Sequence, residues 1–164
     1  MVNIISERMT TELDDEFVVF LIGMRINHWW KIHKWLPVSL AMPKMLKELY
    51  ANPELGFISQ ESWFGRTTLM VQYWKSFEHL EAYAKNRNGT HLPEWVKFNK
   101  KIGNNGDVGI WHETYLIKKG CHESVYNNMP QFGLAKVGKH LSLSQKAQTA
   151  RSRLKNENSM TSKR

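Results

Sequence analysis

The feature that most constrains this fold is the run FVVFLIGMRI at residues 17–26. β-Branched, aromatic and aliphatic side chains occupy both sets of alternating positions in this run. A strand with one buried face alternates between apolar and polar residues, whereas a strand covered on both faces stays apolar throughout. The run therefore predicts a strand near the centre of a sheet, with a layer packed on each side.

Three further strands are expected along the chain. Residues 56–64 and 67–74 form a pair joined by a turn at Gly65 and Arg66, and residues 108–117 (VGIWHETYLI) form the last strand. Each segment is rich in β-branched or aromatic residues and is bounded by glycine or polar residues. We expect the first two of these strands to form a hairpin.

Two helical segments separate the strands. After Pro37, apolar residues recur at the spacing of one helical face, and Pro43 predicts a kink or a restart of that helix. Ser76 is a suitable N-cap for the second segment, which residues 86–89 divide into two pieces. The face of the first segment contains Met42, Met45, Leu46 and Leu49.

The resulting order is β-α-β-β-α-β, an α+β arrangement of the ferredoxin-like kind. Both crossovers place their helices on the same face of a four-stranded sheet. The strands at 17–26 and 108–117 are apolar on both alternating sets, so the other face also requires a cover. We expect the sheet of a second copy to supply it, which predicts a homodimer of the dimeric α/β-barrel type.

Composition is consistent with one domain. The chain has 164 residues, of which 41% are hydrophobic, enough to form a core. Cys121 is the single cysteine, which excludes an intrachain disulfide and is typical of a reducing compartment. The N-terminus lacks the apolar run of a secretory signal, and residues 17–24 are too short to span a bilayer. We therefore expect a soluble, cytoplasmic protein without a membrane partner.

Positive charge is concentrated at the C-terminal end. The net charge is +8, but residues 136–164 contain eight Lys or Arg against the single acid Glu157. That segment is polar and poor in aromatic residues, which is typical of a solubilising, flexible tail. We expect a domain at residues 12–138 and a basic tail at 139–164, and we do not expect nucleic acid as a partner.

The sequence contains no glycine-rich phosphate loop, nucleophile elbow or His-Glu-x-x-His motif. Seven tryptophans and seven histidines stand out instead. His28 and His33 are five residues apart, which does not match the zinc spacing of a helix, so no metal is expected. The neighbouring Trp30 either anchors a loop or borders a substrate.

His91 is the strongest candidate for chemistry. It is one helical turn before Trp95, so both side chains share a face that can point at the sheet. A neutral imidazole beside an aromatic wall can act as a general base. In the last strand, His112 shares a face with Ile110, and it is either a hydrogen-bonded core residue or part of a cavity wall.

A second cluster lies where the strand at 67–74 meets the following helix. Tyr73 and Trp74 end the strand, and His79 lies in the first turn of the helix. A strand end beside a helix start can form the rim of a cleft. His79 is either a base or haem ligand there, or a partly exposed histidine of the capping turn.

Four blocks of this sequence together resemble a poorly characterised bacterial and fungal family that is grouped with the antibiotic-biosynthesis-type monooxygenases. The resemblance covers about residues 14–138. The blocks are residues 23–38, 73–100, 108–117 and 126–138.

The resemblance implies a dimeric α/β barrel with a cavity between sheet and helices. It also implies oxygenation of an aromatic, polyketide-like or terpenoid molecule, often without metal or flavin. The substrate anion itself would reduce molecular oxygen after a base removes a proton. Tyr73, Trp74, His91 and Trp95 match the family's blocks and would line this cavity. We expect His91, Tyr73 and Trp74 to be the catalytic residues, and Trp95, His112, Trp63 and Trp30 to bind the substrate.

Two alternatives stay open. Related barrels bind haem through a helical histidine, for which His79 or His91 would serve, and this would give haem-degrading, peroxidase-like or aldoxime-dehydratase-like chemistry. The chain would otherwise be a non-enzymatic ligand-binding or regulatory module that uses its basic tail as a contact surface. The monooxygenase reading needs no cofactor, whereas the first alternative requires haem.

Overall fold

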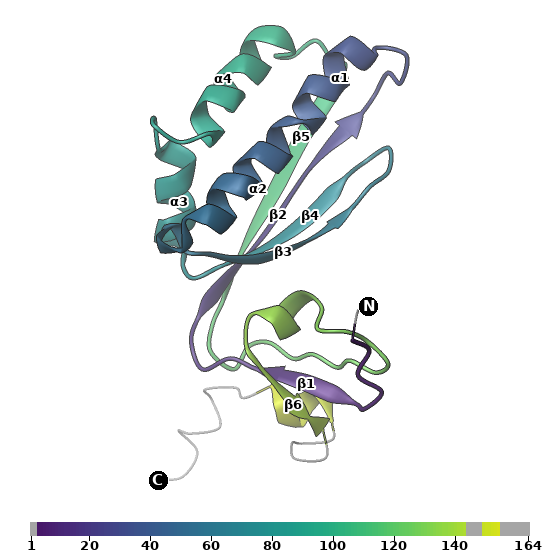
Figure 1. Ribbon diagram of the computed structural model, residues 1–164, viewed down its shortest axis with the longest axis vertical. Helices are drawn as coiled ribbons and strands as arrows, with labels where there is room; N and C mark the ends of the chain where they lie inside the picture. Colours follow the sequence, from purple (N-terminus) through teal and green to yellow (C-terminus); the bar gives the residue numbers. More distant parts are fainter. Residues whose placement is uncertain (1–2, 144–148, 155–164) are drawn as a thin grey trace.

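The computed structural model describes residues 3–143 and 149–154 (Figure 1). Its main sheet has the strand order β3-β4-β2-β5, and all neighbouring strands are antiparallel. The central strand β2 pairs with β5 over its whole length, from Phe17 opposite Ile117 to Ile26 opposite Val108. The strands are β2 Phe17–Ile26, β3 Phe57–Trp63, β4 Leu69–Trp74 and β5 Val108–Ile117.

Four helices cover one face of this sheet (Figure 1). They are α1 Ile32–Ser39, α2 Ala41–Ala51, α3 Phe77–Lys85 and α4 His91–Lys101, and a 3-10 turn, η1 Pro53–Leu55, follows α2. The order β2-α1α2-β3-β4-α3α4-β5 confirms the ferredoxin-like α+β fold predicted from the sequence. Among the described residues, no helix is long and apolar enough to cross a membrane.

The first helical segment begins earlier than predicted. Helix α1 starts at Ile32 and already contains Pro37, and the chain breaks at Leu40 before α2 begins. Pro43 explains the break, because it has no N–H to donate to the carbonyl of Ser39 and its ring crowds that group. Ser76 caps α3 as expected, with its hydroxyl accepting a hydrogen bond from the His79 amide at 3.4 Å.

The core between sheet and helices consists of two separate clusters. One contains Val18, Leu49, Phe57, Trp74, Leu80 and Tyr83, and the other contains Met24, Ile26, Ile102 and Val108. Val18 and Ile26 belong to opposite ends of β2. The two clusters therefore close the two ends of the space between the layers.

A second, two-stranded sheet lies below the main one in Figure 1. It joins β1 Met9–Glu12 to β6 Lys139–Ser142, and two short turns accompany it, η2 Gly133–Lys136 and α5 Ala150–Arg153. The domain predicted at residues 12–138 therefore leaves out β6 and all of β1 except Glu12. These strands were missed because each is short and its partner lies at the other end of the chain. Most of the expected tail, residues 144–148 and 155–164, lies outside the described residues.

The chain itself covers part of the other face of the main sheet. Glu61 of β3 accepts a hydrogen bond from the Gly133 amide at 2.9 Å and forms an ion pair with Lys136 at 2.6 Å. The ring of Trp63 packs edge-on to Phe132, with 6.0 Å between centroids. The segment around η2 thus fills a role that the sequence assigned to a second copy, while the edge strand β5 stays exposed at Tyr115 and Leu116.

Candidate functional site

A cavity of about 930 Å³ lies between the sheet and the helices. Residues of all four helices line it, and neither α1 nor α4 contains a buried residue. Its walls are mostly apolar, and the large apolar side chains among them include Phe20, Met24, Met42, Met45, Met70, Phe77, Trp95 and Phe98. Apolar cavities with a few polar groups are the usual binding sites for small molecules.

His91, the first residue of α4, lies in the wall of this cavity. Its Nδ1 is 3.1 Å from the carbonyl oxygen of Ala84 at the end of α3. A carbonyl oxygen only accepts hydrogen bonds, so the neutral imidazole must hold its proton on Nδ1 to make this contact. Nε2 is then left unprotonated and able to accept a proton.

Glu48 of α2 fixes the backbone that carries His91. Its carboxylate accepts a hydrogen bond from the Tyr83 hydroxyl at 3.0 Å and another from the Thr90 amide at 3.0 Å. Burial, together with the hydrogen bond to Glu48, raises the pKa of Tyr83. One carboxylate therefore joins α2, α3 and the start of α4, and sequence reasoning missed it because its partners come from distant segments.

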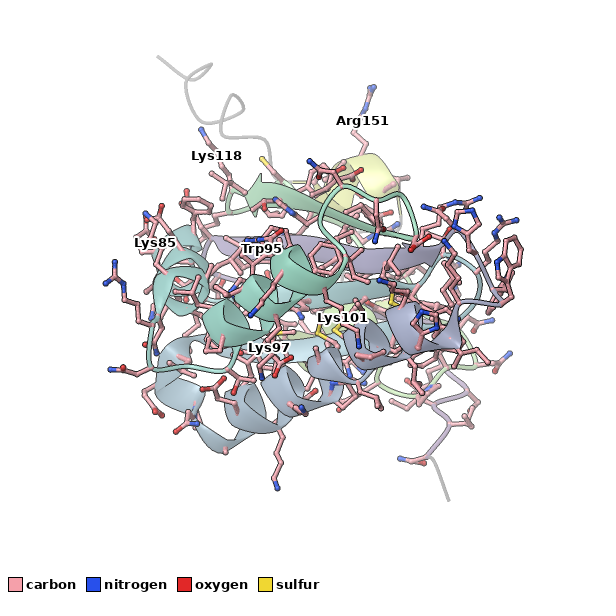
Figure 2. The ribbon with its side chains drawn as sticks, turned by 90° about the horizontal axis from the view of Figure 1, so that it is seen from above. Lys85, Trp95, Lys97, Lys101, Lys118 and Arg151 are labelled. Atoms are coloured by element: carbon pink, nitrogen blue, oxygen red, sulfur yellow. The ribbon has the colours of Figure 1, made fainter. Side chains whose placement is uncertain are left out.

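Trp95 and His112 occupy facing elements of the same cavity. Trp95 stacks on Phe98 with 5.5 Å between ring centroids and is 43% exposed, so it lies where the cavity meets solvent. Figure 2 shows Trp95 on the side of α4 toward β5, with Lys97 and Lys101 on the side toward α1 and α2. His112 projects from β5, and its ring lies 5.7 Å from that of Phe20.

Tyr73 and Trp74, two of the predicted catalytic residues, do not line the cavity. Successive strand residues point to opposite faces, so Tyr73 lies on the other side of the sheet, beside Phe17 and Gly133. Trp74 does face the helices, but it is 1% exposed and its indole N–H donates to Gln72 Oε1 at 3.0 Å. It belongs to the packed core at one end of the cavity.

The remaining predicted site residues lie in three different places. Trp63 borders the cavity, and its ring packs on Phe132. Trp30 is 74% exposed on the loop before α1 and contacts the ring of His28, 5.1 Å away. His79 turns away from the cavity, because its Nδ1 bonds the Ser76 hydroxyl at 2.9 Å and its ring packs on Gly56. Of the two histidines suggested as haem ligands, only His91 reaches the cavity.

The described residues contain no group of three or more His, Cys, Asp or Glu side chains that could hold a metal ion.

Sequence reasoning also missed the methionines of the cavity wall. Met42 and Met45 were expected on the inner face of a helix, and unbranched methionine side chains adapt to ligands of irregular shape. Their spacing indicated an apolar face, but it could not distinguish a packed core from a cavity.

Comparison with known proteins identifies the family. The sequence profile described as "Monooxygenase af470-like" matches residues 17–134. The curated protein Monooxygenase af470 of Aspergillus fumigatus is 29% identical over 128 residues, which are 68% of this chain and 42% of that protein. The chain thus spans less than half the length of this relative.

The solved structure of aldoxime dehydratase shares the fold. Aldoxime dehydratase aligns with a TM-score of 0.59 and 17% identity, over 84% of this chain and 43% of that one. SnoaB, a cofactor-independent oxygenase from Streptomyces nogalater, aligns with a TM-score of 0.45 and 11% identity, over 64% of this chain and 95% of that one. The profile match covers most of the chain and confirms the resemblance found in the sequence. The chain belongs to the Monooxygenase af470-like family.

Proposed function

We propose that this protein is a small-molecule monooxygenase that works without a bound cofactor, in the cavity between sheet and helices. Family membership supports the reaction class. The apolar walls favour an aromatic, polyketide-like or terpenoid substrate. The observation that carries the proposal is His91, whose Nδ1 contact with Ala84 leaves Nε2 as a proton acceptor in the cavity wall.

The proposed chemistry oxidises an activated CH₂ group to a carbonyl. Nε2 of His91 removes one proton, and the resulting enolate transfers one electron to molecular oxygen. The carbon radical and superoxide then combine to form a C–O bond. The peroxide loses water to give the carbonyl, so one oxygen atom enters the product, the other leaves as water, and the substrate supplies all the electrons.

The residues around His91 support this role. Trp95 and Phe98 form an aromatic wall that limits the access of water to the reacting pair. Exclusion of water protects reactive intermediates and strengthens electrostatic interactions within a site. His112 lies in the strand wall and would bind a polar group of the substrate.

Isotope labelling tests the reaction. The protein is incubated under ¹⁸O₂ with anthrone, an uncharged polycyclic molecule. Its CH₂ group lies between two aromatic rings. The proposal predicts one ¹⁸O atom in the quinone product and a rate well above that of the protein-free solution. A rate equal to that of the solution without protein, for anthrone and for a panel of similar polycyclic substrates, would overturn it.

Haem remains the alternative cofactor, because a free Nε2 also suits an iron ligand. His91 would hold the iron, which would supply oxygen or substrate activation when bound. Titration with haem separates the two cases. A saturable Soret band that is lost in His91→Ala and kept in His79→Ala would establish haem ligation, whereas the absence of such a band leaves the cofactor-free mechanism ahead.

The proposal includes a homodimer in the cytoplasm. The exposed side chains Tyr115 and Leu116 of the edge strand β5 favour contact with a second copy there. Analytical ultracentrifugation tests this. The expected result is a dimer that dissociates in Leu116→Asp, and a monomer at all concentrations would remove this part of the proposal.

A further inference from the structure

A group of exposed apolar side chains lies at the end of the molecule where α1 begins. We name it the docking face, and each member is between 41% and 88% exposed. The docking face consists of Trp29, Trp30, Ile32, Leu36, Leu40 and Phe64. Contiguous exposed apolar surface on a protein usually marks a site of interaction.

These residues form one surface. Ile32 and Leu36 lie one helical turn apart on α1, and Leu40, its C-cap, continues their stripe. Trp29 precedes the helix, and its ring packs edge-on to that of Trp35, with 6.1 Å between centroids. Phe64 belongs to the β3–β4 turn, which Arg66 ties to the chain entering α1 through hydrogen bonds to the carbonyls at positions 26 and 27. Figure 1 shows this turn and the start of α1 at the same end of the molecule.

Helix α1 is apolar on both its inner and its outer side. On the inner side, Trp35 and Val38 pack on the core cluster of Met24 and Ile26. On the outer side, the stripe of the docking face has no cover among the described residues. The helix also contains the polar residues His33, Lys34 and Ser39, but an exposed stripe of large apolar side chains usually marks a contact surface. The outer stripe of α1 is therefore expected to lie against something else.

Basic side chains outnumber acidic ones around the docking face. Residues 27–47 contain four lysines and no Asp or Glu, although Lys44 lies 3.8 Å from the carboxylate of Glu94. Arg66 lies in the adjacent turn. Lys101 lies next to α1 (Figure 2), where its carbonyl accepts a hydrogen bond from Lys34 at 3.4 Å. The nearby carboxylate of Asp107 is already paired with Lys31 at 2.6 Å and His28 at 3.0 Å.

Tryptophan rings beside an apolar stripe, with lysines around them, match the chemistry of a bilayer surface. Tryptophan prefers the boundary between headgroups and acyl chains, and lysine and arginine are attracted to anionic lipids. We propose that the docking face binds the surface of an anionic lipid bilayer. This needs no spanning segment, and it revises the expectation that the protein has no membrane partner.

The position of the cavity gives this surface a purpose. Phe64, which is 88% exposed, also lines the cavity, as do Pro37 and Val38 of α1. The cavity therefore opens beside the docking face. This step rests on the proposed function: an apolar substrate dissolved in the bilayer would pass from the lipid into the cavity without crossing water.

Vesicle sedimentation tests the proposal. The full chain is mixed with vesicles of phosphatidylcholine alone, or of phosphatidylcholine and phosphatidylserine in a roughly 7:3 ratio. We expect affinity for the anionic vesicles to be about tenfold higher, and to fall as salt is raised. Tryptophan emission should shift to shorter wavelength on binding.

Matched variants locate the contact. The double variant Leu36→Ser with Phe64→Ser is expected to lose at least about tenfold in vesicle affinity. Ile4→Ser, which removes an apolar side chain that is 55% exposed near β1, is expected to bind like the parent protein. Circular dichroism checks that the variants are folded. The single variant Leu36→Met keeps the apolar surface and should therefore bind vesicles like the parent protein.

Three results would overturn the proposal. The first is equal affinity for neutral and anionic vesicles, and the second is undiminished binding by a folded double variant. The third is absence of vesicle binding together with loss of self-association in the double variant, which would make the docking face a protein interface. Vesicle binding is measured without substrate, so failure of the oxygenation assay alone would remove the proposed function and leave this result standing.

Discussion

Tyr73 and Trp74 are consecutive residues of β4, yet their side chains lie on opposite faces of the sheet. Trp74 packs among the helices against Phe57 and Tyr83. Tyr73 faces Gly133 and the charged side chain of Glu61 on the other side. The two residues therefore cannot act together in one site, and neither touches the cavity that contains His91.

Tyr73→Phe is expected to leave the oxygenation rate unchanged and to alter stability at alkaline pH. Burial, with smaller contributions from Tyr126 and Glu61, raises the pKa of Tyr73 from 10.0 to about 12. The unfolded chain loses this proton at a lower pH than the folded chain, so the stabilisation is complete below pH 10 and declines toward pH 12. Denaturant unfolding between these values should show a shallower decline in Tyr73→Phe than in the parent, and an identical decline would contradict this.

His122 makes the fold sensitive to acid. Burial lowers its pKa from 6.5, although the nearby Glu12 acts in the opposite direction. The folded state keeps the imidazole neutral while the unfolded chain takes up a proton, so stability is full above pH 6.5 and is lost as the pH falls. Thermal unfolding should show a smaller loss on acidification in His122→Asn. His33→Asn, at an exposed position, is the control and should follow the parent.

Gly23 in β2 has no room for a side chain. A Cβ atom there would collide with the Thr68 carbonyl and lie 2.7 Å from Trp111 Nε1. Overpacking of this kind destabilises a protein by about 1–3 kcal/mol, which is expected for Gly23→Ala in urea unfolding. Gly109→Ala in the neighbouring β5 is a matched control, because its Cβ would meet nothing closer than 3.7 Å. Equal effects of the two variants would show that space at Gly23 is not limiting.

Glu48 is expected to act as a positioning residue for His91. Glu48→Ala leaves the Tyr83 hydroxyl and the Thr90 amide without their acceptor, which should lower the free energy of unfolding by about 1–3 kcal/mol. It should also lower kcat more than it raises KM, because His91 follows Thr90 directly. Glu48→Gln keeps one acceptor oxygen and should recover part of both losses. A stability loss with unchanged kcat would leave Glu48 a purely structural role.

The strands and their order could be predicted because their pattern is local. Residues 17–26 and 108–117 were placed to the residue, since long runs of β-branched and aromatic side chains have few other conformations. The pairing of β1 with β6 could not be predicted, because MTTE and KHLS are too short and polar to carry a pattern. Their partner is fixed only by the tertiary fold.

The candidate site was predictable in part. His91 and Trp95 share a helical face in the sequence and lie together in the cavity wall. The strand period alone separates Tyr73 from Trp74, so that grouping contradicted a rule already available. Glu48 gave no signal, because the two groups that it binds, at positions 83 and 90, belong to other segments.

The most direct test of the proposed general base is the oxygenation rate of His91→Gln under air, with anthrone or the best substrate of the panel and with His33→Gln as control. We expect His91→Gln to lower kcat by about 100-fold or more, because a general base contributes at least that factor. His33→Gln should stay within about twofold of the parent, and added imidazole should restore part of the rate to His91→Ala. If folded His91→Gln kept the parent rate, His91 would not be the base, and the cavity chemistry described above would be wrong.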